Sequence, residues 1–364
     1  MARHGRERRQ DPRRQPRQGI RQGAYHLRHD SPQGEYRRHR VQLCAQVLHL
    51  LQGQGPRAPV RICTDDEHGI ARLGCNGGAA MIDNPTRVKD LIKNLAKGDS
   101  GKAQLLQRRY AMERFLERMA ESNYKQNLVL KGGMLVTSML DIGQRMTRDT
   151  DVTMLNKTLS VESAAEMARD IASIPLGDGM MFDVEDAYEI MEDSEYGGVR
   201  IEMRAHLGKT EIPIKLDIST GDALTPSAIS YTYRLMLEDR DIDILAYNVE
   251  TELAEKIETM LVRSTLNTRM RDFYDMWALL NMGAKIDNVT LAEAIAATAR
   301  TRGHEASLAD SGSVIDALSA SEAMTEHWER YRDRNDFAAD LSWGEALDAV
   351  RALCDKAASV KRTF

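Results

Sequence analysis

The spacing of hydrophobic residues changes once along this chain of 364 residues, and the change divides it into two parts. Between residues 81 and 248, stretches with apolar residues at i, i+3 and i+4 are interleaved with short apolar or alternating runs. The first pattern is typical of helices and the second of strands. From residue 249 onward only the helical spacing is found. The sequence therefore predicts an α/β lobe at 81–248 joined to an all-α lobe at 249–364.

Both lobes can be divided further into expected elements. In the α/β lobe, Gly208 between two extended runs predicts a hairpin, and Ser160 is a typical N-cap. The expected helices of this lobe are 88–95, 104–119, 134–140 and 160–174, and its expected strands are 128–130, 151–155, 181–190, 198–206, 211–219 and 241–247. The all-α lobe is expected to contain helices at 250–264, 271–281, 290–300, 313–320, 322–332 and 344–357.

The first 80 residues have an unusual composition, with fifteen Arg, no Lys and seven acidic residues, a net charge of +8. We favour the interpretation that this segment is not natural protein but GC-rich sequence read in the wrong frame, because Met81 looks like a start and helical periodicity follows it at once. A disordered basic tail is the second interpretation. A nucleic-acid-binding arm, or a zinc site at Cys44, Cys63 and Cys75, is the third, although these spacings lack the usual close Cys pairs.

The remaining chain, 81–364, carries thirty-five basic and forty-eight acidic residues, a net charge of −13. Its one cysteine, Cys354, excludes an internal disulfide, and its three His lie in unrelated segments. Its chemistry must then rest on carboxylates, Lys and Arg. No apolar run is long enough to span a membrane, and no secretory signal follows the N-terminal arginines, so a cytoplasmic location is expected.

A glycine turn and a downstream acidic pair are the strongest candidates for chemistry. Gly132 and Gly133 separate the buried strand 128–130 from an apolar helix, where backbone N–H groups can approach a phosphate. Asp149 and Asp151 begin the next strand, and alternate strand residues project to the same face. Mg²⁺ held by a few carboxylates and by substrate phosphates would offset the repulsion between them. The pattern indicates nucleotidyl transfer.

Three further candidates also have a structural explanation. Lys215 and Asp217 share the polar face of an alternating strand, and on the pattern alone a solvated ion pair between them is the better explanation. Lys256 lies off the apolar stripe of its helix, among acids that suit a surface network. Arg271 and Asp272 begin a helix, where an acidic residue is favoured by the helix dipole. A cationic patch beside a carboxylate metal site would instead suit a polyphosphate.

Together these motifs resemble the polymerase-β-type nucleotidyltransferase superfamily, and more specifically the AbiEii/AbiGii toxin family. The resemblance covers roughly residues 81–280. It rests on four blocks in the family's order: Val129-Leu130-Lys131-Gly132-Gly133-Met134-Leu135 with Arg145-x-Thr147-x-Asp149-x-Asp151, then Lys215-Leu216-Asp217-Ile218-Ser219-Thr220-Gly221-Asp222, then Ala254-Glu255-Lys256-Ile257-Glu258, and Asn267-Thr268-Arg269-Met270-Arg271-Asp272-Phe273-Tyr274-Asp275.

The resemblance implies an α/β (α+β) lobe with a mixed sheet and assigns roles to the candidates. Asp149 and Asp151 would bind Mg²⁺, and Asp217 would complete the metal site or accept the proton of the attacking hydroxyl. The nucleotide would be bound by Lys131, Gly132, Gly133, Lys215, Lys256, Arg271 and Asp272. One departure from the superfamily is Met134, which stands where a serine is usual. Thr137 or Ser138 would have to replace the missing hydroxyl contact to phosphate.

The biology implied by the resemblance is the toxin half of a bacterial type IV toxin–antitoxin or phage-abortive-infection pair. The enzyme would transfer a nucleoside monophosphate, from GTP or CTP, to a hydroxyl of an RNA such as tRNA or of a protein. Its antitoxin would be of the AbiEi type and act without a stable complex. Two alternatives stay open: a nucleotide-binding regulatory module that no longer catalyses, motivated by Met134, and a DNA-binding protein that uses the basic arm.

Overall fold

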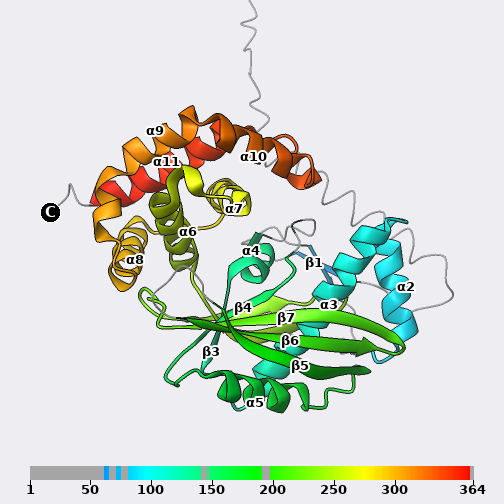
Figure 1. Cartoon of the computed structure of the whole chain (residues 1–364). Coiled ribbons are helices and arrows are strands. Elements are labelled where there is room, and N and C mark those ends of the chain that lie inside the picture. The colour runs from blue at the N-terminus through cyan, green and yellow to red at the C-terminus, as the bar shows by residue number, and fades with distance from the viewer. Residues whose placement is uncertain are drawn as a thin grey trace, which may run out of the picture. The chain divides into compact units, whose positions relative to one another are not determined.

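The strands of the α/β lobe form one mixed sheet of seven strands in the order β5-β6-β7-β4-β3-β9-β8 (Figure 1). This computed structural model describes residues 61–64, 71–74, 81–140, 145, 147–190 and 197–360. The strands of the sheet are β3 (Leu128–Lys131), β4 (Thr150–Met154), β5 (Met180–Ile190), β6 (Gly198–Leu207), β7 (Thr210–Thr220), β8 (Ile229–Arg234) and β9 (Asp241–Ala246).

The centre of the sheet brings the candidate residues into register. β3 is buried along its whole length. The apolar run Leu128-Val129-Leu130 is typical of such a central strand, and Lys131 at its end is buried as well. β3 pairs antiparallel with β4 and parallel with β9. β4 pairs parallel with β7, so that Asp151 lies between Lys131 on one side and Asp217 on the other. The C-terminal end of β3 therefore meets the N-terminal end of β4 in the centre of the sheet.

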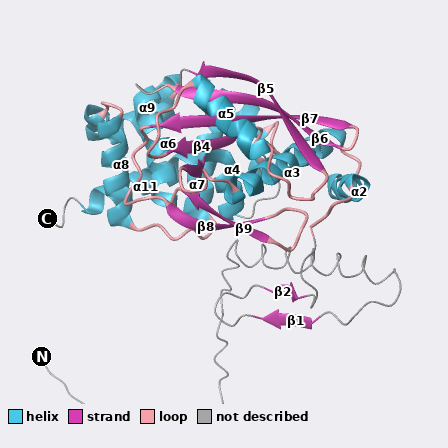
Figure 2. Ribbon diagram, turned by 90° about the horizontal axis from the view of Figure 1, so that it is seen from below, coloured by secondary structure: helices cyan, strands magenta, loops and turns pink. Residues whose placement is uncertain are grey.

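Four helices accompany the sheet: α2 (Pro85–Ala96), α3 (Ser100–Glu121), α4 (Gly132–Leu140) and α5 (Val161–Ala172). Asn84 caps α2 through the amides of Thr86 and Arg87, and Ser160 forms a capping box with Ser163 at the start of α5. α5 lies below the sheet in Figure 1 and crosses its strands in Figure 2. α3 packs against both α5 and the sheet.

The C-terminal lobe is all helical and lies above the sheet in Figure 1. Its elements are α6 (Val249–Arg263), η1 (Ser264–Leu266), α7 (Met270–Asn281), α8 (Asn288–Thr301), η2 (Glu305–Asp310), α9 (Ser311–Ala320), α10 (Glu322–Arg332), η3 (Asp336–Ala338) and α11 (Trp343–Val360). The boundary expected at 248/249 falls between β9 and α6.

Helix α4 joins the two hydrophobic cores. Met134 and Leu135 belong to the core of the α/β lobe, whereas Val136 and Leu140 pack in the core of the helical lobe. The glycine turn at the start of α4 is therefore fixed by packing on two sides. This position places it where the sheet meets the helical lobe.

The predicted fold class, a mixed-sheet α/β lobe with an all-α C-terminal lobe, is confirmed, and Gly208 does lie in the β6–β7 turn with φ +61°. The sequence did not predict β8, nor the antiparallel pair β1 (Arg61–Thr64) and β2 (Ala71–Gly74). The remaining expectations for residues 1–80 lie outside the described residues. Within the part of the chain that the structure describes, every helix is too short or too polar to cross a lipid bilayer.

Candidate active site

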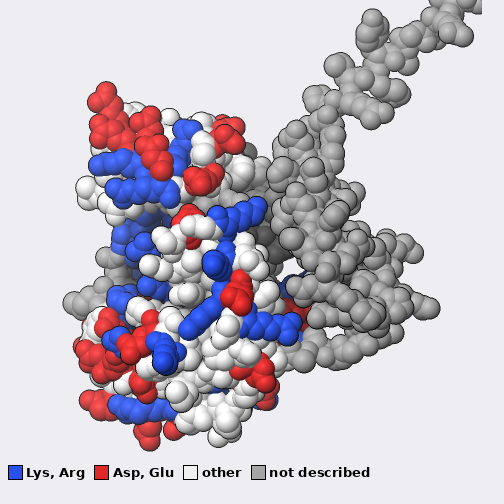
Figure 3. Space-filling model, turned by 90° about the vertical axis from the view of Figure 1, so that its right-hand side faces the viewer, with Lys and Arg blue, Asp and Glu red and all other residues white. Residues whose placement is uncertain are grey.

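A charged cleft of about 910 Å³ opens between the central strands and the helical lobe. Its acidic lining residues are Asp149, Asp151, Glu252, Glu255, Glu258 and Asp272, and its basic ones are Lys131, Arg145, Lys256, Arg263, Arg269, Arg271, Arg302, Arg330 and Arg334. On the face drawn in Figure 3, Lys and Arg side chains are interspersed with acidic ones. Such a lining suits a polyanion.

The glycine turn forms the floor of the cleft. Gly132 has φ +67°, which disfavours any residue with a Cβ, and a Cβ there would lie only 2.5 Å from a carboxylate oxygen of Asp151. A Cβ on Gly133 would lie 2.7 Å from the hydroxyl oxygen of Thr147. Glycine at both positions therefore allows the turn to approach the D-x-D strand closely. The amides that begin α4 and the two carboxylates consequently share one small space.

The two carboxylates of the D-x-D strand both line the cleft, and the third predicted acid does not. The Asp149 carboxylate makes no hydrogen bond or ion pair within the described residues. Asp217 lies beside Asp151 in the sheet, but Arg200 on β6 holds its carboxylate through two hydrogen bonds of 2.7 and 2.6 Å. The side chain of Asp217 is thereby directed to the neighbouring strand.

These positions bear on the expected metal. The described part of the chain contains no cluster of three or more His, Cys, Asp or Glu residues arranged to hold an ion. Mg²⁺, however, is commonly held by one or two carboxylates while substrate phosphates and water complete its octahedron. Asp149 and Asp151 fit that arrangement, since both face the cleft beside the glycine turn. A cage of three carboxylates would require Asp217 to leave Arg200.

Lys256 is buried at the junction of α6 and α7. Its ammonium lies 3.0 Å from Asp272 and 3.1 Å from Asp275. Burial by itself lowers the pKa of Lys256, but the carboxylates of Asp272, Asp275 and Glu252 outweigh it and raise the pKa above its ordinary value. The lysine is therefore a permanent cation at the cleft wall, as a phosphate contact requires.

Arg145 connects α7 to the glycine turn. Its guanidinium is 1% exposed, donates to Asp275 at 2.6 Å and donates to the carbonyl of Gly133 at 2.7 Å. Because Asp275 also pairs with Lys256, one buried carboxylate holds a cation from each lobe. This arrangement makes Asp275 and Arg145 residues that hold the glycine turn and Lys256 in position.

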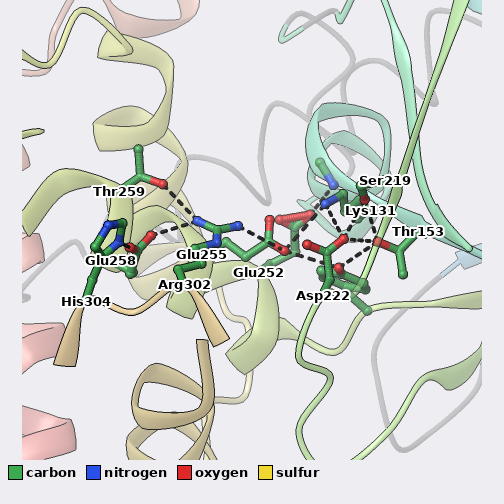
Figure 4. A network of polar contacts seen from close by, with 12 residues as sticks. Lys131, Thr153, Ser219, Asp222, Glu252, Glu255, Glu258, Thr259, Arg302 and His304 are labelled. Atoms are coloured by element: carbon green, nitrogen blue, oxygen red, sulfur yellow. Dashed lines mark hydrogen bonds and ion pairs between the residues drawn. The ribbon is translucent and has the colours of Figure 1, made fainter. Parts of the chain in front are cut away.

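Lys131 is held by carboxylates at the inner end of the cleft (Figure 4). Its ammonium lies 2.9 Å from Asp222 and 3.5 Å from Glu255. Burial raises the pKa of Asp222, but Lys131 and the hydroxyls of Ser219 and Thr153 outweigh this effect and lower it to about 2. The sequence marked Asp222 only as the end of a family block, and it did not predict this contact.

A second chain of ion pairs continues from Glu255 along the helical wall (Figure 4). Arg302, which directly follows α8, lies 3.6 Å from Glu255 and 2.7 Å from Glu258. His304 makes a hydrogen bond of 2.6 Å with Glu258. No local sequence signal pointed to Arg302 or His304, because they reach the cleft only through the packing of α8 against α6.

The structure brings most of the predicted site residues together. The cleft lining includes Lys131, Gly132, Gly133, Asp149, Asp151, Lys256, Arg271 and Asp272. Asp217 and Lys215 are not part of that lining. Lys215 is 40% exposed on its side chain and pairs with Glu202 at 3.0 Å on the neighbouring strand.

The departure at Met134 is not compensated by either nearby hydroxyl. Met134 is buried and packs against Thr150. Thr137 donates its hydroxyl to the carbonyls of Gly133 and Arg145, and the hydroxyl of Ser138 bonds that of Tyr231. The turn therefore offers backbone amides to a phosphate, but neither the Thr137 nor the Ser138 hydroxyl is directed at the phosphate position.

A glycine turn before a helix, a D-x-D strand beside it and a cationic cleft wall define a nucleotidyltransferase. The chain belongs to the AbiEii nucleotidyl transferase toxin family of type IV toxin–antitoxin systems, whose family model matches residues 114–352. No curated protein sequence matches it.

Several solved structures are similar to this chain. MenT4, a nucleotidyltransferase toxin from Mycobacterium tuberculosis H37Rv, is 15% identical, with a TM-score of 0.45 over 74% of this chain and 98% of its own. JHP933 from Helicobacter pylori is 17% identical, with a TM-score of 0.39 over 71% of this chain and 96% of its own. An antigenic nucleotidyltransferase-like protein from Paracoccidioides brasiliensis is 12% identical, with a TM-score of 0.31 over 65% and 92%.

Proposed function

We propose that this nucleotidyltransferase depends on Mg²⁺ and transfers a nucleoside monophosphate from GTP or CTP to a hydroxyl at an RNA end, with tRNA as the expected acceptor. The observation that carries the proposal is the meeting of the glycine turn, Asp149, Asp151 and Lys256 in one cleft. Amides and a buried cation suit phosphates, and the paired carboxylates suit a hydrated divalent ion.

The bond changes of the reaction are those of an in-line displacement. The acceptor oxygen forms a bond to the α-phosphorus, the bond to the pyrophosphate oxygen breaks, and the hydroxyl proton passes to a carboxylate. Asp149 and Asp151 would hold the metal, which when bound supplies charge neutralisation at the phosphates and aligns the reacting oxygens. Asp217 is the candidate proton acceptor, because it adjoins Asp151 and would become available once it exchanged Arg200 for the acceptor.

The residues of the chain contribute mainly by binding and orientation. The amides at the start of α4 and the ammonium of Lys256 would bind the triphosphate, and Arg271 would bind it from the cleft mouth. Asp272 would keep Lys256 in place through their 3.0 Å contact. Positioning the α-phosphorus against the acceptor oxygen by itself lowers the activation free energy of the transfer substantially.

The charge at the cleft mouth favours an RNA acceptor over a protein. Arg271 and Arg334 are exposed there, and within the described residues neither makes an ion pair. Arg263, Arg269 and Arg330 line the same mouth. A wall of guanidinium groups suits the phosphate backbone of an RNA end, because planar donors pair well with phosphate oxygens. Membership of the toxin family supports the further proposal that the chain acts against phage-infected cells and is opposed by an AbiEi-type antitoxin that would form no stable complex with it.

The test is label transfer. The full chain is incubated with Mg²⁺, total tRNA and each α-labelled nucleoside triphosphate in turn, with parallel reactions that contain EDTA or lack RNA. Label on tRNA that requires Mg²⁺, and that Asp149→Asn or Asp151→Asn eliminates, supports the proposal. Label on the protein in the absence of RNA would instead identify a protein acceptor. Transfer that persists in EDTA would reject the role of the metal.

One observation favours a second candidate, a nucleotide-binding module without catalysis. Met134 removes the serine hydroxyl of the turn, and Thr137 and Ser138 direct their own hydroxyls elsewhere. In that case nucleotide would bind to the chain with Mg²⁺ while no label would be transferred. Restoring the hydroxyl by Met134→Ser and repeating both measurements separates the two candidates.

A further inference from the structure

A carboxylate from the helical lobe occupies the first amide of the glycine turn. Glu252, in the first turn of α6, accepts a hydrogen bond from the backbone N–H of Gly132. Its side chain belongs to the cleft lining, although the residue is only 2% exposed. The start of a helix attracts anions because its first amides are unpaired and the dipole is positive there. Glu252 therefore takes the place that a phosphate would take.

The environment of Glu252 compensates its charge poorly. Within the described residues, the Gly132 amide is its one hydrogen-bond donor, and no cation lies within ion-pair distance of its carboxylate. Burial raises the pKa of Glu252, and although Lys256 and Lys131 attract its charge from farther away, Glu255 repels it. A buried carboxylate ordinarily accepts several hydrogen bonds. This arrangement is not one that folding stability alone would select.

Lys256 offers the Glu252 carboxylate an alternative partner. Lys256 is four residues further along α6, so it lies on the same face of the helix as Glu252. Rotation of the Glu252 side chain towards Lys256 would free the Gly132 amide.

We propose that Glu252 is an internal competitor for the nucleotide, and that the triphosphate binds only by displacing its carboxylate from the Gly132 amide. The inference rests on the proposed function, since it takes the glycine turn to be the phosphate site. It makes Glu252 a residue that lowers nucleotide affinity, and thereby raises the triphosphate concentration at which the enzyme becomes active.

Glu252→Gln tests the inference, because glutamine keeps the size and the accepting oxygen but removes the charge. The full chain is titrated with tripolyphosphate and with a non-hydrolysable nucleoside triphosphate in Mg²⁺ by calorimetry. A neutral acceptor is displaced more easily than a charged one, so affinity should rise about tenfold. Glu250→Gln is the matched control. Glu250 lies in the same helical turn and is also buried, but it accepts a hydrogen bond from the Asp287 amide at 2.8 Å and lies outside the cleft lining, so the affinity of Glu250→Gln should change by less than about twofold.

A second variant keeps the test valid if Glu252→Gln fails to fold. Glu252→Asp keeps the charge but shortens the side chain by one methylene group, which withdraws it from the Gly132 amide, and it should also bind triphosphate more tightly. Affinity that is unchanged or weaker in both variants overturns the inference, even where the wild type transfers label to RNA and the proposed function stands. If the wild type and every variant bind no triphosphate and transfer no label, the proposed function fails together with the inference.

Discussion

Replacing Asp222 by Asn removes the charge that holds the buried ammonium of Lys131. The pKa of Asp222 is about 2 in the folded chain against an ordinary value of 3.8. The ionised carboxylate therefore favours the folded state by about 2 kcal/mol at neutral pH, since each pKa unit corresponds to about 1.4 kcal/mol. The side chain is 12% exposed, so solvent screens the interaction only weakly. We expect Asp222→Asn to reduce the free energy of unfolding by about this amount.

The lowered pKa also fixes the sign of the pH dependence. A carboxyl group whose folded pKa is depressed contributes stability above its unfolded pKa, and the contribution is lost as the pH falls through its folded pKa. The difference between wild type and Asp222→Asn should therefore be constant from about pH 7 to about pH 5. It should narrow between about pH 4 and about pH 2, where Asp222 becomes protonated in both states.

Urea unfolding followed by circular dichroism measures this difference at each pH. Asp239→Asn is the control, because Asp239 is 64% exposed and its 3.2 Å pair with Arg234 lies on the surface. Its removal should cost less than about 1 kcal/mol at any pH. A difference for Asp222→Asn that is absent at neutral pH, or that stays the same at about pH 3, would refute the reasoning.

Three further predictions follow from the site. Asp149→Asn and Asp151→Asn should abolish label transfer yet leave the melting temperature unchanged or higher, because each removes repulsion between paired carboxylates; a variant with near wild-type turnover contradicts the metal assignment. Lys256→Ala should weaken triphosphate binding by about one to two decades in calorimetry, and Lys215→Ala much less, since Lys215 pairs with Glu202 outside the cleft lining. Asp275→Asn should cost about 3–5 kcal/mol of unfolding free energy, because it leaves the buried cation Arg145 without its partner; a loss below about 1 kcal/mol would count against this assignment.

The sequence predicted most elements because their patterns are local. The uniformly apolar 128–130 gave a central strand, and the alternation of 211–219 gave a strand with one buried face. The strand β8 was missed although its residues alternate as a strand's should. It is short and lies at the edge of the sheet, and Tyr233 is its one fully buried residue, so its apolar signal is weak.

The charges of β7 show where pattern reasoning needed the partner strand. A solvated pair between Lys215 and Asp217 was one interpretation, since the two share a face of the strand. The structure instead pairs each of them with the residue directly opposite on β6, Lys215 with Glu202 and Asp217 with Arg200. Residues directly opposite on antiparallel strands are closer than residues two apart on one strand. The register between strands, which the sequence does not state, decides the pairing.

The cleft likewise combines what motifs predict with what only packing supplies. Gly132, Asp151 and Lys256 belong to recognisable blocks and were predicted to act together. Glu252 and Arg302 carry no such signal, yet they contact the turn and the wall of the same cleft, because Glu252 at the start of α6 bonds the Gly132 amide and α6 packs against α8.

The net charge of the chain was also a weak guide to the acceptor, because packing decides where the charged side chains gather. The value of −13 for residues 81–364 argues against tracking along nucleic acid over a broad surface. The arginines of the cleft mouth come from two stretches of the chain that are far apart in the sequence, 263–271 around the end of α6 and the start of α7, and 330–334 around the end of α10. Folding concentrates them over an acidic floor that begins at Asp149 and Asp151. A polyanion is therefore attracted at the mouth and repelled at the floor unless a divalent cation is bound there, which would confine its approach to the site of metal binding.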